Sequence, residues 1–295
     1  MKYRSLGKSG LQISEIGFGC MSLGEDDKYN ATLLNKAIEQ GINFFDTADL
    51  YQKGWNEETV GRALKSKRND IILATKVGNQ WKEDGSGWDW NPSKQYILSS
   101  IDKSLARLQT DYIDLYQLHG GTIEDPIDDT IEAFELLKQQ GKIKHYGISS
   151  IRPNVIREYV QRSDISSVMM QYSLLDRRPE ETCMELLAKN NIGILARGTL
   201  ASGLLIDKTP KRYLNYTEEQ VGKISAAIKS VSDNKASVAL QFVLNNPAIS
   251  SAIVGIRTKE QLDDIIKAYD AESISVENWE LLEKVNSVNY YEQHR

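Results

Sequence analysis

The chain has 295 residues, of which 40% are hydrophobic, and its formal net charge is −5. This length exceeds that of most domains, although α/β barrels commonly reach it as one domain. A mildly acidic chain with interspersed charges gives no reason to expect binding to nucleic acid or to anionic lipid.

The two cysteines and the N-terminal residues indicate a cellular location. Cys20 and Cys183 lie far apart and form no CxxC pair, so we expect a reducing compartment and no metal site. The first residues lack the apolar core of a signal peptide. No run approaches the roughly 18 apolar residues that a membrane helix needs. A cytoplasmic protein without membrane contact is the expectation.

Alternating strands and helices follow a short N-terminal hairpin. The turn cluster at residues 7–10 separates the two arms of the hairpin, and the first long strand reaches Gly19. Eight strands are predicted, beginning at Ile13, Ile42, Ile71, Ile113, Ile143, Ser167, Gly193 and Ala252. Helices are predicted at about 31–40, 57–66, 92–108, 126–140, from 153, 180–190, 236–245 and 259–268.

Eight βα units predict a (β/α)8 TIM barrel in the α/β class, formed by residues 1–295 as a single domain. Additions to it are the hairpin, an interrupting segment at 204–234 with a helix from Thr217, and an extra C-terminal helix at about 276–288. The main alternative is an open doubly wound sheet. Such sheets carry GxGxxG after the first strand, and here the third glycine is missing from residues 17–22.

Three of the predicted strands end in a residue that can exchange protons. These residues are Asp46, Lys76 and His119, and Tyr51 follows Asp46 by five positions. In a barrel the carboxyl ends of all strands meet at one rim, so we expect the four side chains to converge there. Taken singly, each has a plain structural explanation, such as a packed ring or a solvated ion pair. Their expected convergence at one rim is what favours a catalytic role over a structural one.

The four side chains together suit the protonation of an oxygen. An ammonium beside a phenol favours the phenolate, which makes Tyr51 a usable proton donor near neutral pH. Asp46 would keep Lys76 charged and oriented, and His119 could hydrogen-bond a substrate carbonyl. None of them can donate a hydride, so a redox reaction at this rim demands a cofactor.

The sequence resembles the aldo-keto reductase superfamily, in particular its bacterial and potassium-channel-β-subunit-like branch. The likeness covers nearly the whole chain, in order. Matching segments are Gly17-Phe18-Gly19, Phe45-Asp46-Thr47-Ala48 with Tyr51, Ala74-Thr75-Lys76-Val77, Asp111-Tyr112-Ile113-Asp114-Leu115 with His119, Tyr146-Gly147-Ile148-Ser149, Gln171-Tyr172-Ser173-Leu174 and Gly255-Ile256-Arg257-Thr258 with Gln261-Leu262.

The resemblance implies NADPH-dependent reduction of aldehydes or ketones by a monomer or weak homo-oligomer. Hydride would pass from the nicotinamide to a small-molecule carbonyl substrate and Tyr51 would protonate the oxygen. Lys76 and Asp46 would tune Tyr51, and His119 would orient the carbonyl.

The same likeness implies where the nicotinamide end of NADP(H) binds. Ser149 and Ser150 stand where the family has a Ser-Asn pair for the carboxamide, and Gln171 matches its amide-binding glutamine. Arg197 stands where the family usually stacks a tyrosine on the ring. A planar guanidinium can also stack, but it adds charge beside a ring that is cationic when oxidised, so altered cofactor affinity is expected.

The phosphate end is implied in the same way. Leu200, Ser202 and Gly203 match the loop that closes over the pyrophosphate, and the helix from Lys259 begins where a phosphate would sit. Arg257 could bind the 2′-phosphate of NADP bidentately. Asp264-Ile265 replaces the family's Glu-Asn pair near the adenine. The remaining cofactor positions implied are Gly19, Met21, Asp46, Gly198, Leu200, Ser202, Gly203, Gly255, Ile256, Thr258 and Gln261.

Two further functions compete with the reductase. The chain could be a cofactor-binding regulatory subunit that senses redox state, as the channel relatives indicate. It could also be an aldolase or isomerase with Lys76 as a Schiff-base nucleophile, although the grouping of Asp, Tyr, Lys and His argues against this. Trp81, Trp88 and Trp90 lie in the long loop after the third barrel strand. They either line a substrate pocket or pin that loop.

Overall fold

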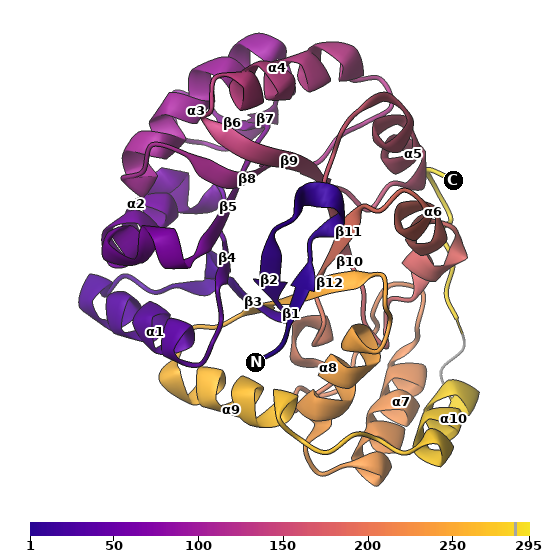
Figure 1. Cartoon of the computed structure of the whole chain (residues 1–295). Coiled ribbons are helices and arrows are strands. Elements are labelled where there is room, and N and C mark those ends of the chain that lie inside the picture. Colours follow the sequence, from indigo (N-terminus) through magenta and orange to yellow (C-terminus); the bar gives the residue numbers. More distant parts are fainter. Residues whose placement is uncertain (286–287) are drawn as a thin grey trace.

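A closed parallel barrel of eight strands forms the centre of the computed structural model, which describes residues 1–285 and 288–295 (Figure 1). The predicted α/β barrel is therefore confirmed. In ring order the strands are β3 (Ile16–Gly19), β4 (Phe44–Asp46), β5 (Ile72–Val77), β8 (Ile113–Leu118), β9 (Ile143–Ser149), β10 (Ser167–Gln171), β11 (Gly193–Arg197) and β12 (Ile249–Gly255). β12 returns to pair with β3 and closes the ring.

Helices surround the barrel, and their apolar faces pack on the outer face of the sheet. The surrounding helices are α1 (Asp27–Glu39), α2 (Trp55–Leu64), α3 (Lys94–Leu108), α4 (Ile127–Gln139), α5 (Pro153–Arg162), α6 (Cys183–Lys189), α8 (Lys235–Leu244) and α9 (Lys259–Tyr269). Two more, α7 (Glu218–Val231) and α10 (Val276–Val285), pack on each other outside this ring. The predicted end of the last helix, at 288, runs through residues 286–287, which lie outside the described residues.

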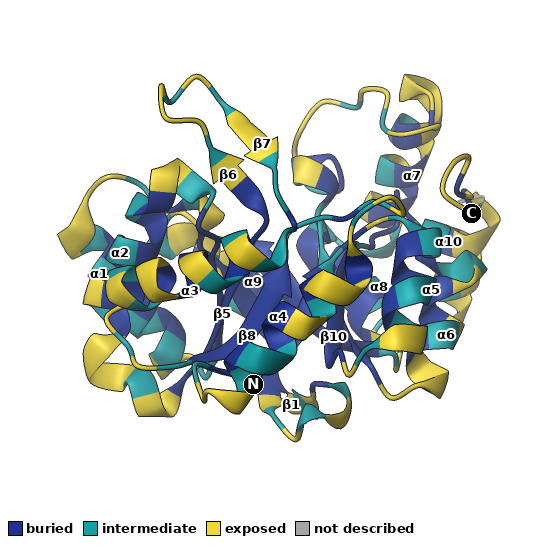
Figure 2. Cartoon of the chain, turned by 90° about the horizontal axis from the view of Figure 1, so that it is seen from above, coloured by how far each residue is buried: buried dark blue, intermediate teal, exposed yellow. Residues whose placement is uncertain are grey.

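The N-terminal hairpin covers one end of the barrel, at the opposite end from a second hairpin (Figure 2). Its strands β1 (Tyr3–Ser5) and β2 (Gln12–Ser14) pair antiparallel. Leu6 and Ile13 join the apolar cluster inside the barrel. Gly7 has φ +51°, and a Cβ there would lie 2.5 Å from the backbone nitrogen of Gly193. Only glycine allows this close approach.

The second hairpin was not predicted. Residues 79–90 were expected to be loop, but β6 (Asn79–Trp81) and β7 (Trp88–Trp90) pair antiparallel above the carboxyl rim. Two indole nitrogens hold it: that of Trp81 donates to the Leu50 carbonyl at 3.2 Å, and that of Trp90 donates to Asp125 at 3.0 Å. The strands were missed because they are short and because their register depends on these tertiary contacts.

Several predicted boundaries were wrong, and side-chain hydrogen bonds explain two of the shifts. α1 begins four residues earlier than expected because the Asp26 side chain accepts hydrogen bonds from the first-turn amides. β12 begins at Ile249 rather than Ala252. Its polar Ser250 and Ser251 hid the strand, yet both hydroxyls donate to backbone carbonyls of the N-terminal hairpin. The helix expected at 180–190 is a 3-10 turn followed by the shorter α6.

None of the helices in the described part of the chain is long and apolar enough to span a bilayer.

Two helical glycines allow a test of the packing between α2 and α3. A Cβ on Gly61 would lie 2.4 Å from the Arg107 carbonyl oxygen, whereas a Cβ on Gly222 of α7 would meet nothing closer than 3.8 Å. We predict that Gly61→Ala lowers the free energy of unfolding by about 1–3 kcal/mol through overpacking. Gly222→Ala should raise it by about 0.5–1 kcal/mol, because alanine favours helix.

Urea unfolding followed by circular dichroism measures both changes. A Gly61→Ala protein as stable as Gly222→Ala would contradict the close approach of the two helices.

Candidate functional site

The alternation of side chains along each strand places the polar residues of the carboxyl rim. Six barrel strands have one residue in the interior apolar cluster, and in five of them the residue two positions later is a polar one on the same interior face. The apolar residue and its polar successor are Phe44 and Asp46, Ala74 and Lys76, Leu115 and Gln117, Met169 and Gln171, and Leu195 and Arg197. The pleat alone therefore gathers polar groups above the barrel core.

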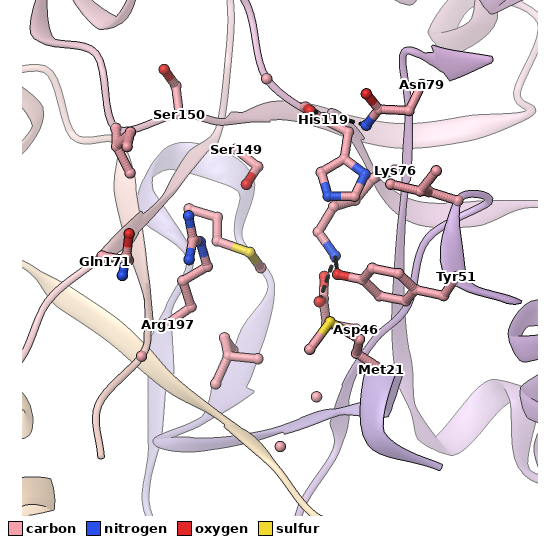
Figure 3. A pocket seen from close by; sticks show the side chains of 18 of the residues that line it. Met21, Asp46, Tyr51, Lys76, Asn79, His119, Ser149, Ser150, Gln171 and Arg197 are labelled. Atoms are coloured by element: carbon pink, nitrogen blue, oxygen red, sulfur yellow. Dashed lines mark hydrogen bonds and ion pairs between the residues drawn. The ribbon is translucent and has the colours of Figure 1, made fainter. Parts of the chain in front are cut away.

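A buried ion pair lies at the centre of this rim (Figure 3). The Nζ of Lys76 lies 2.6 Å from Asp46 Oδ2 and 2.8 Å from the Thr47 carbonyl oxygen. The same nitrogen lies 3.5 Å from the Tyr51 hydroxyl oxygen. The side-chain amide of Gln117 donates to the other oxygen of Asp46 at 3.2 Å. Lys76 is only 1% exposed, so its charge depends on these partners.

Burial opposes the charge on Lys76, yet the Asp46 carboxylate and Tyr51 outweigh it, so the pKa of Lys76 lies above its usual value. Burial raises the pKa of the Asp46 carboxyl, and the charge of Lys76 opposes that rise. The contact at 2.6 Å joins a protonated amine to the carboxylate. Lys76 is thus a fixed positive charge beside the phenol of Tyr51.

His119 is held neutral at the same rim. Its ring meets that of Tyr51 edge-on, with centroids 5.8 Å apart, and the Asn79 side chain donates to its carbonyl oxygen at 3.3 Å. Burial, followed by the charges of Lys76 and Arg197, lowers the pKa of His119 to about 3. A neutral imidazole can donate one N–H to a carbonyl oxygen, but it does not serve as the acid at neutral pH.

A cavity of about 750 Å³ lies over these residues, within the range of small-molecule and cofactor pockets. Figure 3 shows Ser149, Ser150, Gln171 and Arg197 across the cavity from Tyr51 and Lys76. Further lining residues among the sequence-predicted positions are Gly19, Met21, His119, Gly198, Ser202 and Gly255. The structure thus brings all four predicted catalytic residues and nine of the other predicted positions into one cavity: Gly19, Met21, Ser149, Ser150, Gln171, Arg197, Gly198, Ser202 and Gly255.

Arg197 is an unpaired cation in this cavity. Its guanidinium makes no hydrogen bond or ion pair with any described residue, and burial lowers its pKa. A partly buried charge without a partner costs free energy, so the site favours a ligand that is electron-rich or anionic near Arg197.

The loop after β11 has a backbone suited to an anion. Gly198, Ser202 and Gly203 all have positive φ, at 72°, 56° and 91°. Turns of this kind point backbone N–H groups into a concavity that binds phosphate. Leu200 lies in the same loop, half-buried, and does not line the cavity. This part of the chain fits a dinucleotide pyrophosphate.

The other predicted cofactor residues lie at the start of α9, outside the cavity lining. Thr258 caps the helix by accepting from the Gln261 amide, and the Gln261 side chain accepts from the Arg257 amide at 2.8 Å. The Nε of Arg257 donates to the Ser22 carbonyl at 3.1 Å, which leaves its two terminal nitrogens for a ligand. Ile256 is buried and Asp264 is exposed on the helix.

Some lining residues were not found from the sequence. Asn79 comes from the hairpin that the sequence did not reveal, and Tyr213 comes from the interrupting segment, where its hydroxyl accepts from the Gln171 amide at 3.4 Å. Only a tertiary structure places either. Gln117 does not line the cavity but holds Asp46, and it had a signal, because it lies two positions after the interior Leu115 on a strand that precedes His119.

The three tryptophans divide between the two expected roles. Trp88 and Trp90 line the cavity, Trp81 fixes the hairpin to the chain near Tyr51, and Trp90 also fixes it through Asp125. Cys20 is fully buried and donates to the Phe18 carbonyl, and burial raises its thiol pKa. Across the described residues, no group of three or more His, Cys, Asp or Glu side chains has a geometry that could hold a metal ion.

Comparison with known proteins places this geometry in a family. The model of the "Aldo/keto reductase family" matches residues 15–287. An "Uncharacterized oxidoreductase YqkF" of Bacillus subtilis is 50% identical over the full length of both chains. A "Probable voltage-gated potassium channel subunit beta" of Arabidopsis thaliana is 29% identical, with 92% of each chain covered.

A solved structure matches the whole chain closely. The "aldo-keto reductase AKR11C1 from Bacillus halodurans (holo form)" is 49% identical, with 100% of this chain and 99% of that chain covered and a TM-score of 0.95. The apo form of the same protein gives 45% identity over the same coverage and a TM-score of 0.86. The chain therefore has the backbone of the holo form more nearly than that of the apo form.

Behind the ion pair lies a buried carboxyl with an unusual pKa. The Asp49 amide donates to the Lys76 carbonyl at 3.3 Å, and one of its side-chain oxygens is buried without a partner in the described structure. Burial and then the charge of Glu57 raise the pKa of Asp49 to about 8. Below that pH, Asp49 keeps a proton that a free aspartate releases near about 3.9.

The raised pKa of Asp49 makes the stability of the fold depend on pH. Between pH 4 and 8 the folded chain binds a proton at Asp49 that the unfolded chain does not, so this group lowers stability as the pH rises. We predict that Asp49→Asn gains stability relative to the wild type from pH 5 to 8, by up to about 1.4 kcal/mol per pH unit. Urea midpoints across this range measure the difference, and a difference independent of pH would contradict the assignment.

Proposed function

Since the chain belongs to the aldo/keto reductase family, we propose that it reduces aldehydes or ketones to alcohols with NADPH as hydride donor. One observation carries the proposal: the phenol of Tyr51 and the buried Lys76–Asp46 pair meet in one cavity that also contains His119. The residues fit a dinucleotide, because an unpaired cation and a loop of positive-φ residues line or border the same cavity.

The dinucleotide, when bound, supplies the hydride. Tyr51 donates its hydroxyl proton to the carbonyl oxygen, and Lys76, at 3.5 Å, stabilises the phenolate that remains. Asp46 holds Lys76 in the charged form and in place. His119, neutral, donates an N–H to the same carbonyl oxygen and so polarises the carbonyl carbon.

Arg197 biases this site toward the reduced cofactor. Its guanidinium faces the cavity across from Tyr51 in Figure 3, where the resemblance places the nicotinamide. An oxidised nicotinamide is cationic and a reduced one is neutral, so like-charge repulsion weakens binding of the oxidised form selectively. Release of the spent cofactor is thereby favoured.

Replacing the phenol tests the proposal. Tyr51→Phe removes the proton donor, so we predict that kcat for carbonyl reduction falls at least about 100-fold. Its affinity for NADPH, measured by quenching of intrinsic fluorescence, should stay within about 3-fold of the wild type. Tyr112→Phe is the matched control, because Tyr112 precedes β8 at the amino end of the strand, and it should keep full activity.

Two results would argue against this function. Near-normal turnover by Tyr51→Phe would remove the tyrosine from the chemistry. Tight NADPH binding by the wild type without turnover of any carbonyl in a broad panel would favour a regulatory cofactor-binding subunit.

The preference for NADPH over NADH is proposed to come from Arg257. Two charge-assisted hydrogen bonds to the 2′-phosphate stabilise binding by about 1.5–3 kcal/mol each, so Arg257→Ala should weaken NADPH binding roughly 10-fold or more. NADH binding should barely change. Lys267→Ala, at the far end of α9, is the charge-matched control. Equal losses for the two cofactors would remove Arg257 from the phosphate site.

A further inference from the structure

We propose that a second, cationic pocket beside the catalytic cavity binds an oxyanion on the carbonyl substrate, either a carboxylate or a phosphate. The proposal rests on the carbonyl reductase function and adds the substrate class. The pocket has a volume of about 390 Å³. Its charged lining residues are Arg152, Arg178, Arg212 and Glu292.

Four separated segments build this pocket. Residues 151–152 follow β9, Arg178 begins the 3-10 turn Arg178–Glu181, residues 212–215 belong to the interrupting segment, and residues 290–294 form the C-terminal tail. The tail is tied down, because the His294 carbonyl accepts from the Asn154 amide at 2.9 Å and Arg295 pairs with Glu181. The tail side of the pocket is therefore anchored to α5 and to the 3-10 turn Arg178–Glu181.

The pocket is positive in a chain whose net charge is −5. Three guanidinium groups line it against the single carboxylate of Glu292. Arg178 is already neutralised, because Asp176 accepts from it twice, at 2.7 and 2.8 Å. The excess charge therefore comes from the other two arginines.

Arg152 and Arg212 have hydrogen-bond donors to spare. One terminal nitrogen of Arg152 donates to the Gly121 carbonyl at 2.5 Å, which orients the guanidinium and leaves its other terminal nitrogen unbonded. Arg212 is exposed and makes no hydrogen bond or ion pair with the described residues. A planar guanidinium recognises carboxylate and phosphate oxygens in pairs, so these two residues suit an oxyanion.

The pocket adjoins the site of reduction. Ile151 and Arg152 line both cavities, and Gly121, which holds Arg152, lines the catalytic one. A flexible substrate can thus place its carbonyl at Tyr51 and His119 while its anionic end reaches Arg152 and Arg212.

The phosphates of the dinucleotide do not explain the pocket. None of their proposed partners at residues 198–203 and 255–258 lines it. Arg212 comes from the connection after β11, which also carries the proposed pyrophosphate loop, but Arg152 follows β9 and Arg178 follows β10. The two cationic regions are therefore lined by different residues, one set for the cofactor and one for the substrate.

The test compares aldehydic acids of increasing chain length, from succinic to suberic semialdehyde, with their methyl esters. We expect the wild type to show a lower KM for the acid than for its ester once the chain spans both cavities. Arg212→Gln should raise KM for that acid about 10-fold, with kcat and the esters unchanged. Arg152 also lines the catalytic cavity, so Arg152→Gln is scored by the ratio of the acid's KM to the ester's KM, which should rise by a similar factor. Lys211→Gln removes a neighbouring exposed charge outside the pocket and should change nothing.

Phosphate is distinguished from carboxylate by comparing glyceraldehyde 3-phosphate with glyceraldehyde in the same variants. The pocket is supported if either anionic substrate has a lower KM than its neutral partner and if Arg152→Gln and Arg212→Gln abolish that difference. Equal KM values for acids, phosphate and their neutral partners would overturn it, as would equal effects of the variants on charged and neutral substrates.

A binding measurement separates this proposal from the reductase function. Calorimetric titration with glutarate and with inorganic phosphate needs no turnover, and Arg212→Gln should weaken the tighter of the two about 10-fold. If the wild type reduces no carbonyl but Arg212→Gln weakens ion binding as expected, the reductase function fails and the oxyanion pocket stands. If the wild type reduces the esters but binds neither ion more tightly than Arg212→Gln does, the pocket is refuted.

Discussion

The two-residue repeat of the β-strand governs both the stability and the chemistry of this molecule. The same interior face that packs Phe44 and Ala74 into the barrel core presents Asp46 and Lys76 one repeat further along. A shift of one residue in any strand would turn the polar group outward, toward the helices. The apolar layer below therefore fixes the positions of the reactive layer above, and Gln117 follows the same rule.

Electrostatic constraints are resolved differently at each side of the cavity. On one side the charges of Lys76 and Asp46 compensate each other, and burial, followed by the charges of Lys76 and Arg197, lowers the pKa of His119 and keeps its ring neutral. On the other side Arg197 has no such partner within the described chain. One side of the cavity thus has compensated charges and the other has an uncompensated cation. An electron-rich ligand bound beside Arg197 would offset the free-energy cost of burying that unpaired charge.

Barrel topology and the four catalytic candidates were predictable from sequence because both follow from local patterns. Apolar runs mark the strands, and a titratable residue at a strand end must lie at the common rim. What sequence missed depends on distant contacts. The hairpin bearing Asn79 needs the anchors of Trp81 and Trp90, and Tyr213 reaches the cavity from a segment without periodicity. The serines that begin β12 hid a strand because their hydroxyl partners lie more than 230 residues away.

Closure of the ring has a consequence for biosynthesis. β3 forms near the start of the chain, but its second neighbour, β12, leaves the ribosome only after nearly all of the protein has been made. Until then the nascent barrel is an open sheet with two unpaired edges, and such edges invite pairing with other chains. A chaperone bound to this incomplete sheet would protect its unpaired edges. The edges are covered only when β12, the last barrel strand to emerge, pairs with β3 and β11.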